Sequence, residues 1–214
     1  MDGDVFRGWY SRGYLPHFDS DSVPQMVTYR LADSLPHSVV RRLLNETTQG
    51  DPERRERYEA LLDGGYGACV LRQPENAQIV IDAWEFYDGS RYRLLDWCVM
   101  PNHVHITYER PTVGLSTLVK AWKTYTSKQI KTRLGTHGDG EALWQAGFFD
   151  RFARDARHLF HMQCYIWLNP VRAGLVDDPF EWPYSSIHNH ARFRPSIMRW
   201  WEQQKERFWD GGGY

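Results

Sequence analysis

The spacing of apolar residues along the chain follows two periods. Residues 25–32 (QMVTYRLA) alternate with a period of two, which predicts a half-exposed β-strand. Residues 91–100 (RYRLLDWCVM) and 103–109 (HVHITYE) also suit an extended backbone, and the Pro-Asn pair between them indicates a hairpin or a bent strand. A further short extended segment is expected within residues 148–155 (FFDRFARD).

Other segments have a helical period or clear helix start and stop signals. They are residues 35–49, 51–64, 74–89, 114–135 and 156–169, the last capped by Asp155 and ended by Pro170. Residues 1–22 have no clear period, and we expect the last residues, DGGGY, to be mobile. Strands interleaved with helices indicate an α+β fold, in which an antiparallel sheet carries packed helices in a single domain.

Composition narrows the class of protein. A chain of 214 residues is long enough for one domain with a tail. Its three cysteines are odd in number and widely spaced, which favours reduced thiols in a cytoplasm over a disulfide framework. No apolar run is long enough to span a bilayer, and the N-terminal residues lack the architecture of a signal peptide.

Charge is uneven along the chain. The net charge of −1 does not indicate a nucleic-acid-binding protein, but residues 110–137 contain lysines and arginines and no acid. Within the helix predicted there, one arc is apolar and includes Leu115, Leu118, Val119, Trp122 and Tyr125. The opposite arc carries Lys120, Lys123, Lys128 and Lys131. A solvated helix face explains such a stripe, and so does a surface that binds phosphates.

Two histidines, His103 and His105, stand two positions apart in the segment VMPNHVHITYE. If residues 103–108 form a strand, both imidazoles and Thr107 point to one face, while the opposite face is apolar. Two imidazoles on a rigid strand can bind one divalent metal ion and leave coordination positions for substrate oxygens. Two ordinary surface histidines are the competing explanation. In the metal-binding case we expect the pair to face solvent or a substrate.

A polar stripe on the segment 156–169 consists of His158, His161, Tyr165 and Asn169, which share one arc of a helix. A phenol has a pKa of about 10, and it becomes a useful nucleophile when a metal neutralises the charge that develops on a phosphodiester. A partly exposed helix face with a structural tyrosine is the alternative. Because Asn169 precedes a proline, we expect its amide at the helix end, free to turn toward a ligand.

Other nucleophiles and catalytic motifs have weaker support. Tyr125 falls on the apolar arc of its helix and is predicted to belong to the core. Tyr184 follows a proline and lies outside the predicted helices. The sequence contains no Walker A loop, no nucleophile elbow and no His-Glu-x-x-His helix.

Several motifs together resemble the REP-associated tyrosine transposases, which belong to the HUH superfamily of single-tyrosine transposases. In chain order they are MPNHVH (100–105), LWQAGFFDRFARD (143–155), YIWLNPVRAGLV (165–176) and WPYSS (182–186). Two N-terminal stretches, RGYLPHF and TYRLADSLP, resemble the family as well, so the similarity reaches from the N-terminal region to about residue 186.

The resemblance implies a compact α+β domain whose antiparallel sheet, of the ferredoxin or RRM type, carries the HUH strand. It implies Mg²⁺ or Mn²⁺ and cleavage of single-stranded DNA beside hairpins of the repetitive extragenic palindrome type, which leaves a 5′-phosphotyrosine and a free 3′-hydroxyl. By position, His103 and His105 match the HUH histidines, Tyr165 the nucleophile and Asn169 the third metal ligand. Relatives outside this branch often carry Gln in place of Asn169. His161 is a candidate to orient the phenol or touch a phosphate, or it is a structural histidine.

The resemblance also predicts a transposase domain over residues 1–186, with a DNA-recognition segment at 1–22 and a tail at 187–214. In the N-terminal segment, Arg7 and Arg12 alternate with aromatic residues, which suits contacts with DNA as well as a strap packed across the sheet. The four lysines named above are expected to hold phosphates.

Three functions stay open. The first is a metal-dependent endonuclease and strand transferase with a tyrosine nucleophile. The second is a hairpin-binding protein that does not turn over. The third is a metal-dependent phosphodiesterase in which water attacks and Tyr165 only positions the substrate. The sequence does not distinguish a monomer from a homodimer.

Overall fold

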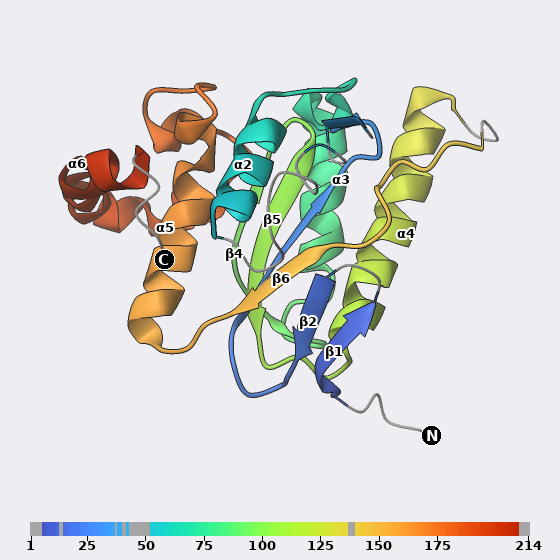
Figure 1. Ribbon diagram of the computed structural model, residues 1–214, viewed down its shortest axis with the longest axis horizontal. Coiled ribbons are helices and arrows are strands. Elements are labelled where there is room, and N and C mark those ends of the chain that lie inside the picture. Colours follow the sequence, from blue (N-terminus) through green and yellow to red (C-terminus); the bar gives the residue numbers. More distant parts are fainter. Residues whose placement is uncertain are drawn as a thin grey trace.

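A four-stranded antiparallel sheet with strand order β4-β5-β3-β6 lies at the centre of the fold (Figure 1). The computed structural model describes residues 6–12, 15–36, 38–39, 42, 52–136 and 140–209. The strands of the sheet are β3 (Gln25–Arg30), β4 (Arg93–Val99), β5 (His103–Glu109) and β6 (Phe149–Phe152). Helix α3 (Pro74–Glu85) precedes β4, and helix α4 (Leu115–Leu134) joins β5 to β6. This β-α-β-β-α-β order is that of the ferredoxin-like fold and confirms the expected α+β architecture.

Strand β3 is buried along its whole length, so the prediction of a half-exposed strand is wrong. It pairs with β5 on one side and β6 on the other, which makes it an interior strand. Side chains on both faces of β3 are buried: Val27 and Tyr29 belong to one hydrophobic cluster, and Met26 on the other face belongs to a second. The predicted hairpin is confirmed, since β4 and β5 pair as antiparallel neighbours.

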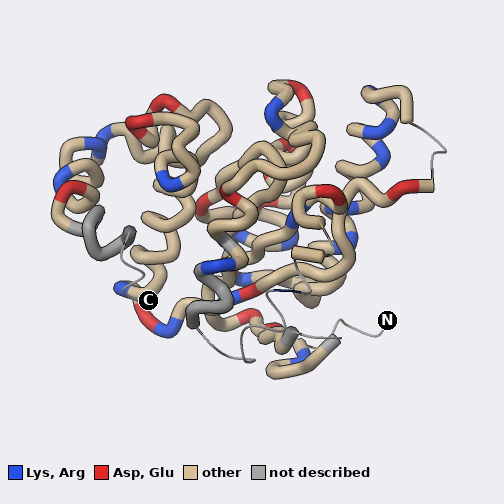
Figure 2. Tube along the Cα trace, turned by 45° about the horizontal axis from the view of Figure 1, so that its top comes forward, with Lys and Arg blue, Asp and Glu red and all other residues tan. Residues whose placement is uncertain are grey.

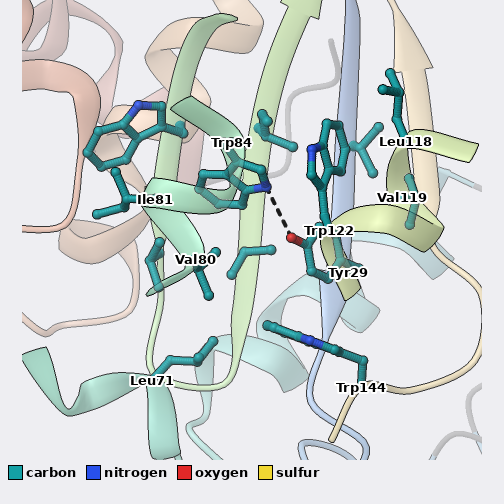
Figure 3. Packing of buried hydrophobic residues seen from close by; sticks show 14 of the residues in the cluster. Tyr29, Leu71, Val80, Ile81, Trp84, Leu118, Val119, Trp122 and Trp144 are labelled. Carbon is teal, nitrogen blue, oxygen red and sulfur yellow. Dashed lines mark hydrogen bonds between the residues drawn. The ribbon is translucent and has the colours of Figure 1, made fainter. Parts of the chain in front are cut away.

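The first hydrophobic cluster lies between the sheet and helices α3 and α4 (Figure 3). Its largest members are aromatic, and polar atoms of these rings bond each other within the cluster. The indole nitrogen of Trp84 donates to the hydroxyl of Tyr29 at 3.1 Å, and that of Trp122 donates to the hydroxyl of Tyr92 at 3.1 Å. Buried Trp and Tyr need such partners, so these bonds fix which rings face one another.

Helix α4 corrects one assignment, because Tyr125 is 50% exposed and not part of the core. The buried stripe of α4 passes instead through Trp122, Thr126 and Ile130. The Thr126 hydroxyl donates to the Trp122 carbonyl and accepts from the Trp144 indole, which satisfies it inside the core. A polar residue therefore occupies the core position, and Tyr125 is rotated outward.

The second hydrophobic cluster packs helix α5 (Ala156–Arg172) against the other face of the sheet. Asp155 caps this helix, as predicted: its side chain accepts from the His158 backbone N–H. The prediction that Pro170 ends the helix is wrong, because α5 continues to Arg172 with Pro170 inside it. The tight turn comes only at Gly174, which has a positive φ of 64°.

The chain after α5 packs back onto it, and part of residues 187–214, which we expected as a tail, takes part in this packing. Segments η2 (Pro179–Glu181) and η3 (Ser186–Phe193) are followed by helix α6 (Arg194–Trp209). Ile187, Ile197 and Trp201 are buried in the second cluster. Residues 210–214, which we expected to be mobile, lie outside the described residues.

The N-terminal segment is regular, in contrast to the expectation of an irregular start. It forms a hairpin of β1 (Gly8–Arg12) and β2 (Leu15–Asp19), in which Trp9 pairs with Phe18. These strands are defined by the pairing of their backbones with each other, and the apolar periodicity of the sequence does not reveal such pairing. The remaining elements are α2 (Pro52–Asp63) and η1 (Val70–Arg72). Most of the helix predicted at 35–49 lies outside the described residues. Among the described helices, none has the length and apolar character that crossing a membrane requires.

Candidate active site

The histidine pair lies on β5 and points to the face of the sheet that α5 covers. Val104 and Ile106 point to the opposite face and belong to the first cluster, as the alternation predicts. His103 and His105 are each 1% exposed, so of the two expected surroundings, solvent or a substrate, open solvent does not apply. Residues outside β5, which the strand pattern does not reveal, cover both rings.

Hydrogen bonds fix the protonation of the His103 ring. The Asn102 side-chain nitrogen donates to the carbonyls of Leu62 and Tyr66, each at 3.1 Å, which leaves the Asn102 side-chain oxygen 2.8 Å from His103 Nδ1. That oxygen can only accept, so Nδ1 carries the proton and Nε2 carries the lone pair. This is the arrangement of a metal-ligating histidine whose other nitrogen is held by a neighbour.

His105 has the same tautomer. Its Nδ1 lies 2.8 Å from the Thr28 hydroxyl, and its Nε2 lies 2.9 Å from the side-chain nitrogen of Asn169. Because the Asn169 N–H₂ group donates, Nε2 carries the lone pair and Nδ1 donates to Thr28. Both histidines therefore present a lone pair on Nε2.

Helix α5 brings Tyr165 and Asn169 to this histidine pair. The ring of Tyr165 lies edge-on to that of His105, with 5.5 Å between the centroids. Tyr165 is 6% exposed and Asn169 is fully buried. Four residues predicted from separate parts of the sequence thus lie in one place.

The donor set fits a divalent cation. Asn169 Oδ1 is buried and has no hydrogen-bond partner, which is costly for an amide oxygen. A half-turn of this amide would place Oδ1 beside the His105 lone pair, and a cation there would satisfy both atoms. Within the described chain, no three His, Cys, Asp or Glu side chains are grouped to hold a metal. The amide oxygen of Asn169 is a ligand type outside that set, and its missing partner fits the cation that the resemblance implies.

Burial lowers the pKa of His103 to about 3, and the positive charge of Arg172 contributes to the same effect. Removal from water disfavours the charged imidazolium, and a nearby cation adds to that penalty. His103 is therefore neutral at physiological pH, so its lone pair is available.

Two charged residues beside the site were missed by the sequence analysis. The guanidinium carbon of Arg172 lies 4.9 Å from the centroid of the Tyr165 ring. Asp63, at the end of α2, has one carboxylate oxygen 4.0 Å from Arg172 Nη2 and the other 3.8 Å from His103 Nε2. The position of Arg172, two turns after Tyr165 on the same helix arc, was an available signal. Nothing in the sequence connects Asp63 with the histidines.

A buried carboxylate, Asp96 of β4, fixes α5 on the sheet. It accepts hydrogen bonds from Gln163 at 2.6 Å, from the indole of Trp167 at 2.9 Å and from the hydroxyl of Ser186 at 2.9 Å. His190 of η3 contacts the same carboxylate at 3.0 Å. In the sequence, Asp96 is a single acid within a largely apolar strand. This pattern indicates a buried carboxylate, and a buried carboxylate needs hydrogen-bond donors around it.

The other tyrosine and histidine candidates lie away from the pair or have other partners. Tyr125 is on α4, which covers the face of the sheet opposite the histidine pair. Its position argues against Tyr125 as the nucleophile, whereas its side chain is exposed and not buried as predicted. Tyr184 is partly buried and packs against both clusters. The ring of His161 lies 6.1 Å from that of Trp200 in α6, and its role toward Tyr165 stays a prediction.

The four lysines of α4 line one hollow, together with residues 142–148 and His17. Figure 2 marks the lysine and arginine positions along the chain in blue and the acidic positions in red. The hollow has a volume of about 820 Å³, and no acid is among its lining residues. The ammonium groups of Lys123 and Lys131 donate to backbone carbonyls. Burial lowers the pKa of Lys123 to about 8. Lys120 and Lys128 are exposed.

The N-terminal arginines are described only in part. Arg7 is exposed and its guanidinium lies 5.7 Å from the ring of Tyr10, whereas the side chain of Arg12 lies outside the described part of the chain. Trp9 is 65% exposed and its ring lies 5.9 Å from that of Phe152 in β6. The hairpin therefore packs beside the edge of the sheet and still presents aromatic surface to solvent.

Comparison with known proteins finds related transposases. Residues 75–167 match the family described as Transposase IS200 like. A REP-associated tyrosine transposase of Escherichia coli is 31% identical over 93 residues, which are 43% of this chain and 52% of the relative. A Haemophilus influenzae protein, named as a candidate REP-associated tyrosine transposase, is 29% identical over 105 residues, which are 44% of this chain and 58% of the relative. The matches thus span little more than half the length of these relatives.

The solved structure of a REP-associated tyrosine transposase bound to a REP hairpin is also similar, with 19% identity and a TM-score of 0.49 over 86% of each chain. The family match includes His103, His105 and Tyr165 and ends shortly before Asn169. The resemblance that the sequence motifs indicated is confirmed: residues 75–167 match the Transposase IS200 like family, and the chain is similar over part of its length to REP-associated tyrosine transposases.

Proposed function

We propose that this protein is a metal-dependent single-stranded DNA endonuclease and strand transferase that acts beside hairpins of the repetitive extragenic palindrome type. The observation that carries the proposal is the convergence of Tyr165 and Asn169 on the histidine pair, with a buried amide oxygen that has no partner. The relatives named as REP-associated tyrosine transposases support the substrate class.

His103, His105 and Asn169 are the residues that would hold Mg²⁺ or Mn²⁺. When bound, the ion would polarise the phosphodiester and neutralise charge that develops on it. The protein contributes two imidazoles whose Nδ1 atoms are held by Asn102 and Thr28, so that Nε2 of each ring would face the ion.

Tyr165 supplies the nucleophile in this proposal. Its phenol oxygen attacks phosphorus, an O–P bond forms and the bond from phosphorus to the 3′ oxygen breaks. The phenol proton goes to solvent, and the departing 3′ oxygen takes a proton from solvent. A second 3′-hydroxyl can then attack the phosphotyrosine, which transfers the strand and restores the phenol without consuming a nucleotide.

Access to Tyr165 is narrow. Only 6% of the residue is exposed, so a shift of neighbouring side chains would widen the path of a phosphodiester to the phenol. The hollow on α4 lies against the opposite face of the sheet, so its lysines would hold DNA at a distance from the reaction. Arg7 and the exposed Trp9 would contact bases or phosphates at the sheet edge.

The test is covalent capture of DNA. A labelled single-stranded hairpin is incubated with the protein and Mg²⁺ or Mn²⁺ and run on a denaturing protein gel. We expect a shifted band from the wild type, no band from Tyr165→Phe and an unchanged band from Tyr125→Phe, which removes an exposed hydroxyl on the far face. Loss of the band in Tyr125→Phe instead would contradict the assignment. Metal-dependent cutting without a band would favour attack by water, and hairpin binding without cutting would favour a binding protein.

A further inference from the structure

Arg172 is the cation closest to the proposed nucleophile among the described contacts of Tyr165. It belongs to the last turn of α5, two turns after Tyr165, and long side chains on a helix point back toward its N-terminus. This direction explains why the guanidinium lies over the Tyr165 ring, 4.9 Å from its centroid. The Arg172 side chain is 15% exposed, so water screens its charge only in part.

Asp63 is a second neighbour of the guanidinium. Its carboxylate is 12% exposed and lies 4.0 Å from Arg172 Nη2, which is longer than the usual hydrogen bond of a charged pair. The same carboxylate faces His103. A negative group that enters beside Tyr165 would thus meet a cation already oriented by a carboxylate and an aromatic ring, so little side-chain entropy would be lost when the cation binds it.

A brace between α2 and α5 is the structural alternative for these contacts. A brace requires only a positive charge near Asp63 and an apolar stem against the Tyr165 ring. A phosphate-binding role requires in addition that the guanidinium sense the charge of an anion at the phenol. The planar fork of arginine suits a phosphate, which offers two non-bridging oxygens at matching spacing.

We propose that Arg172 binds the non-bridging oxygens of the scissile phosphodiester and stabilises negative charge on it when Tyr165 attacks. The inference rests on the proposed function of Tyr165 and adds a substrate-binding role for Arg172, a residue of the motif YIWLNPVRAGLV to which the sequence analysis gave no role. In this role Arg172 contacts the phosphate from the α5 side, opposite the ion that the neutral histidines would hold.

The test compares a charged with an uncharged linkage in the absence of chemistry and of metal. The probes are the dinucleoside phosphate TpT and its methylphosphonate analogue, titrated into the protein in EDTA and followed by NMR. Wild type should bind TpT roughly tenfold more tightly than the analogue, the size expected for one charge-assisted contact. Arg172→Gln should bind both probes alike, and Arg172→Lys should keep part of the preference.

Arg91 provides the matched control. Its guanidinium stacks on the Tyr87 ring at 4.1 Å, in the same type of contact at a place remote from the histidines. Arg91→Gln should therefore retain the full preference for TpT. A preference that survives in Arg172→Gln, or no measurable preference in the wild type, would overturn the assignment of Arg172. The covalent capture assay reads Tyr165 separately, so failure of the proposed function is distinguished from failure of this inference.

Discussion

Replacing Asn169 by leucine should affect metal binding far more than stability. The wild-type amide donates one hydrogen bond to His105, and its oxygen is buried without a partner. Leucine has a similar size, so it leaves little cavity. It removes the unsatisfied oxygen, which relieves roughly 1–3 kcal/mol, and it leaves the His105 lone pair unpaired, which costs about the same. The two effects oppose one another, and we expect the free energy of unfolding in EDTA to change by less than about 1 kcal/mol.

Metal should stabilise the wild type more than Asn169→Leu. A ligand at about a hundred times its dissociation constant stabilises a protein by roughly 2.7 kcal/mol. Urea unfolding of the wild type with Mn²⁺ should show a gain of this size over EDTA, and Asn169→Leu should lose most of the gain. Asn169→Asp should be less stable in EDTA, because it buries a carboxylate, and should gain more from Mn²⁺.

Asn76 provides a control for the cost of an unsatisfied amide. Its side-chain oxygen is likewise buried without a partner, and it lies on α3, on the opposite face of the sheet. Asn76→Leu should leave the Mn²⁺-dependent gain unchanged. The reasoning fails if Asn169→Leu keeps that gain, or if it costs several kcal/mol in EDTA.

Other substitutions test the remaining parts of the argument. His103→Gln and His105→Gln should abolish cutting and lower stability, since each ring is buried and hydrogen-bonded; unchanged cutting in both, measured beside circular dichroism, would contradict the metal site. Replacing Lys120 and Lys128 by Gln should reduce the slope of log affinity against log salt by about 0.7 for each lost contact with a single strand, and an unaltered slope would leave that helix face as ordinary surface. Lys123 has a pKa of about 8 in the folded protein, against 10.5 as its ordinary value. The folded state therefore holds fewer protons than the unfolded chain between these values, and the stability of wild type relative to Lys123→Met should rise with pH through this window, by up to about 1.4 kcal/mol per pH unit. Urea unfolding near pH 8 and near pH 10 measures the difference, and a flat result would mean that the carbonyls around Lys123 keep it charged.

Local sequence determined much of the fold and the identity of the four central residues. The period of two in residues 103–109 placed the two histidines on one face, and the helical spacing of Tyr165 and Asn169 placed them on one arc. Both follow from backbone geometry alone, which is why they could be read without a structure. The hairpin of β4 and β5 was equally local, since a Pro-Asn pair separates the two strands.

Only the tertiary structure decided what surrounds those residues. Which elements pack together decides the burial of the histidine pair, the exposure of Tyr125 and the burial of β3 on both faces. The periodicity of a single segment does not show which other elements cover it. Asp63 and Asp96 show the same limit at the site, because each acts through partners distant in sequence. The sequence determined which groups the helix and strand present, and long-range packing decided their distances, protonation and accessibility.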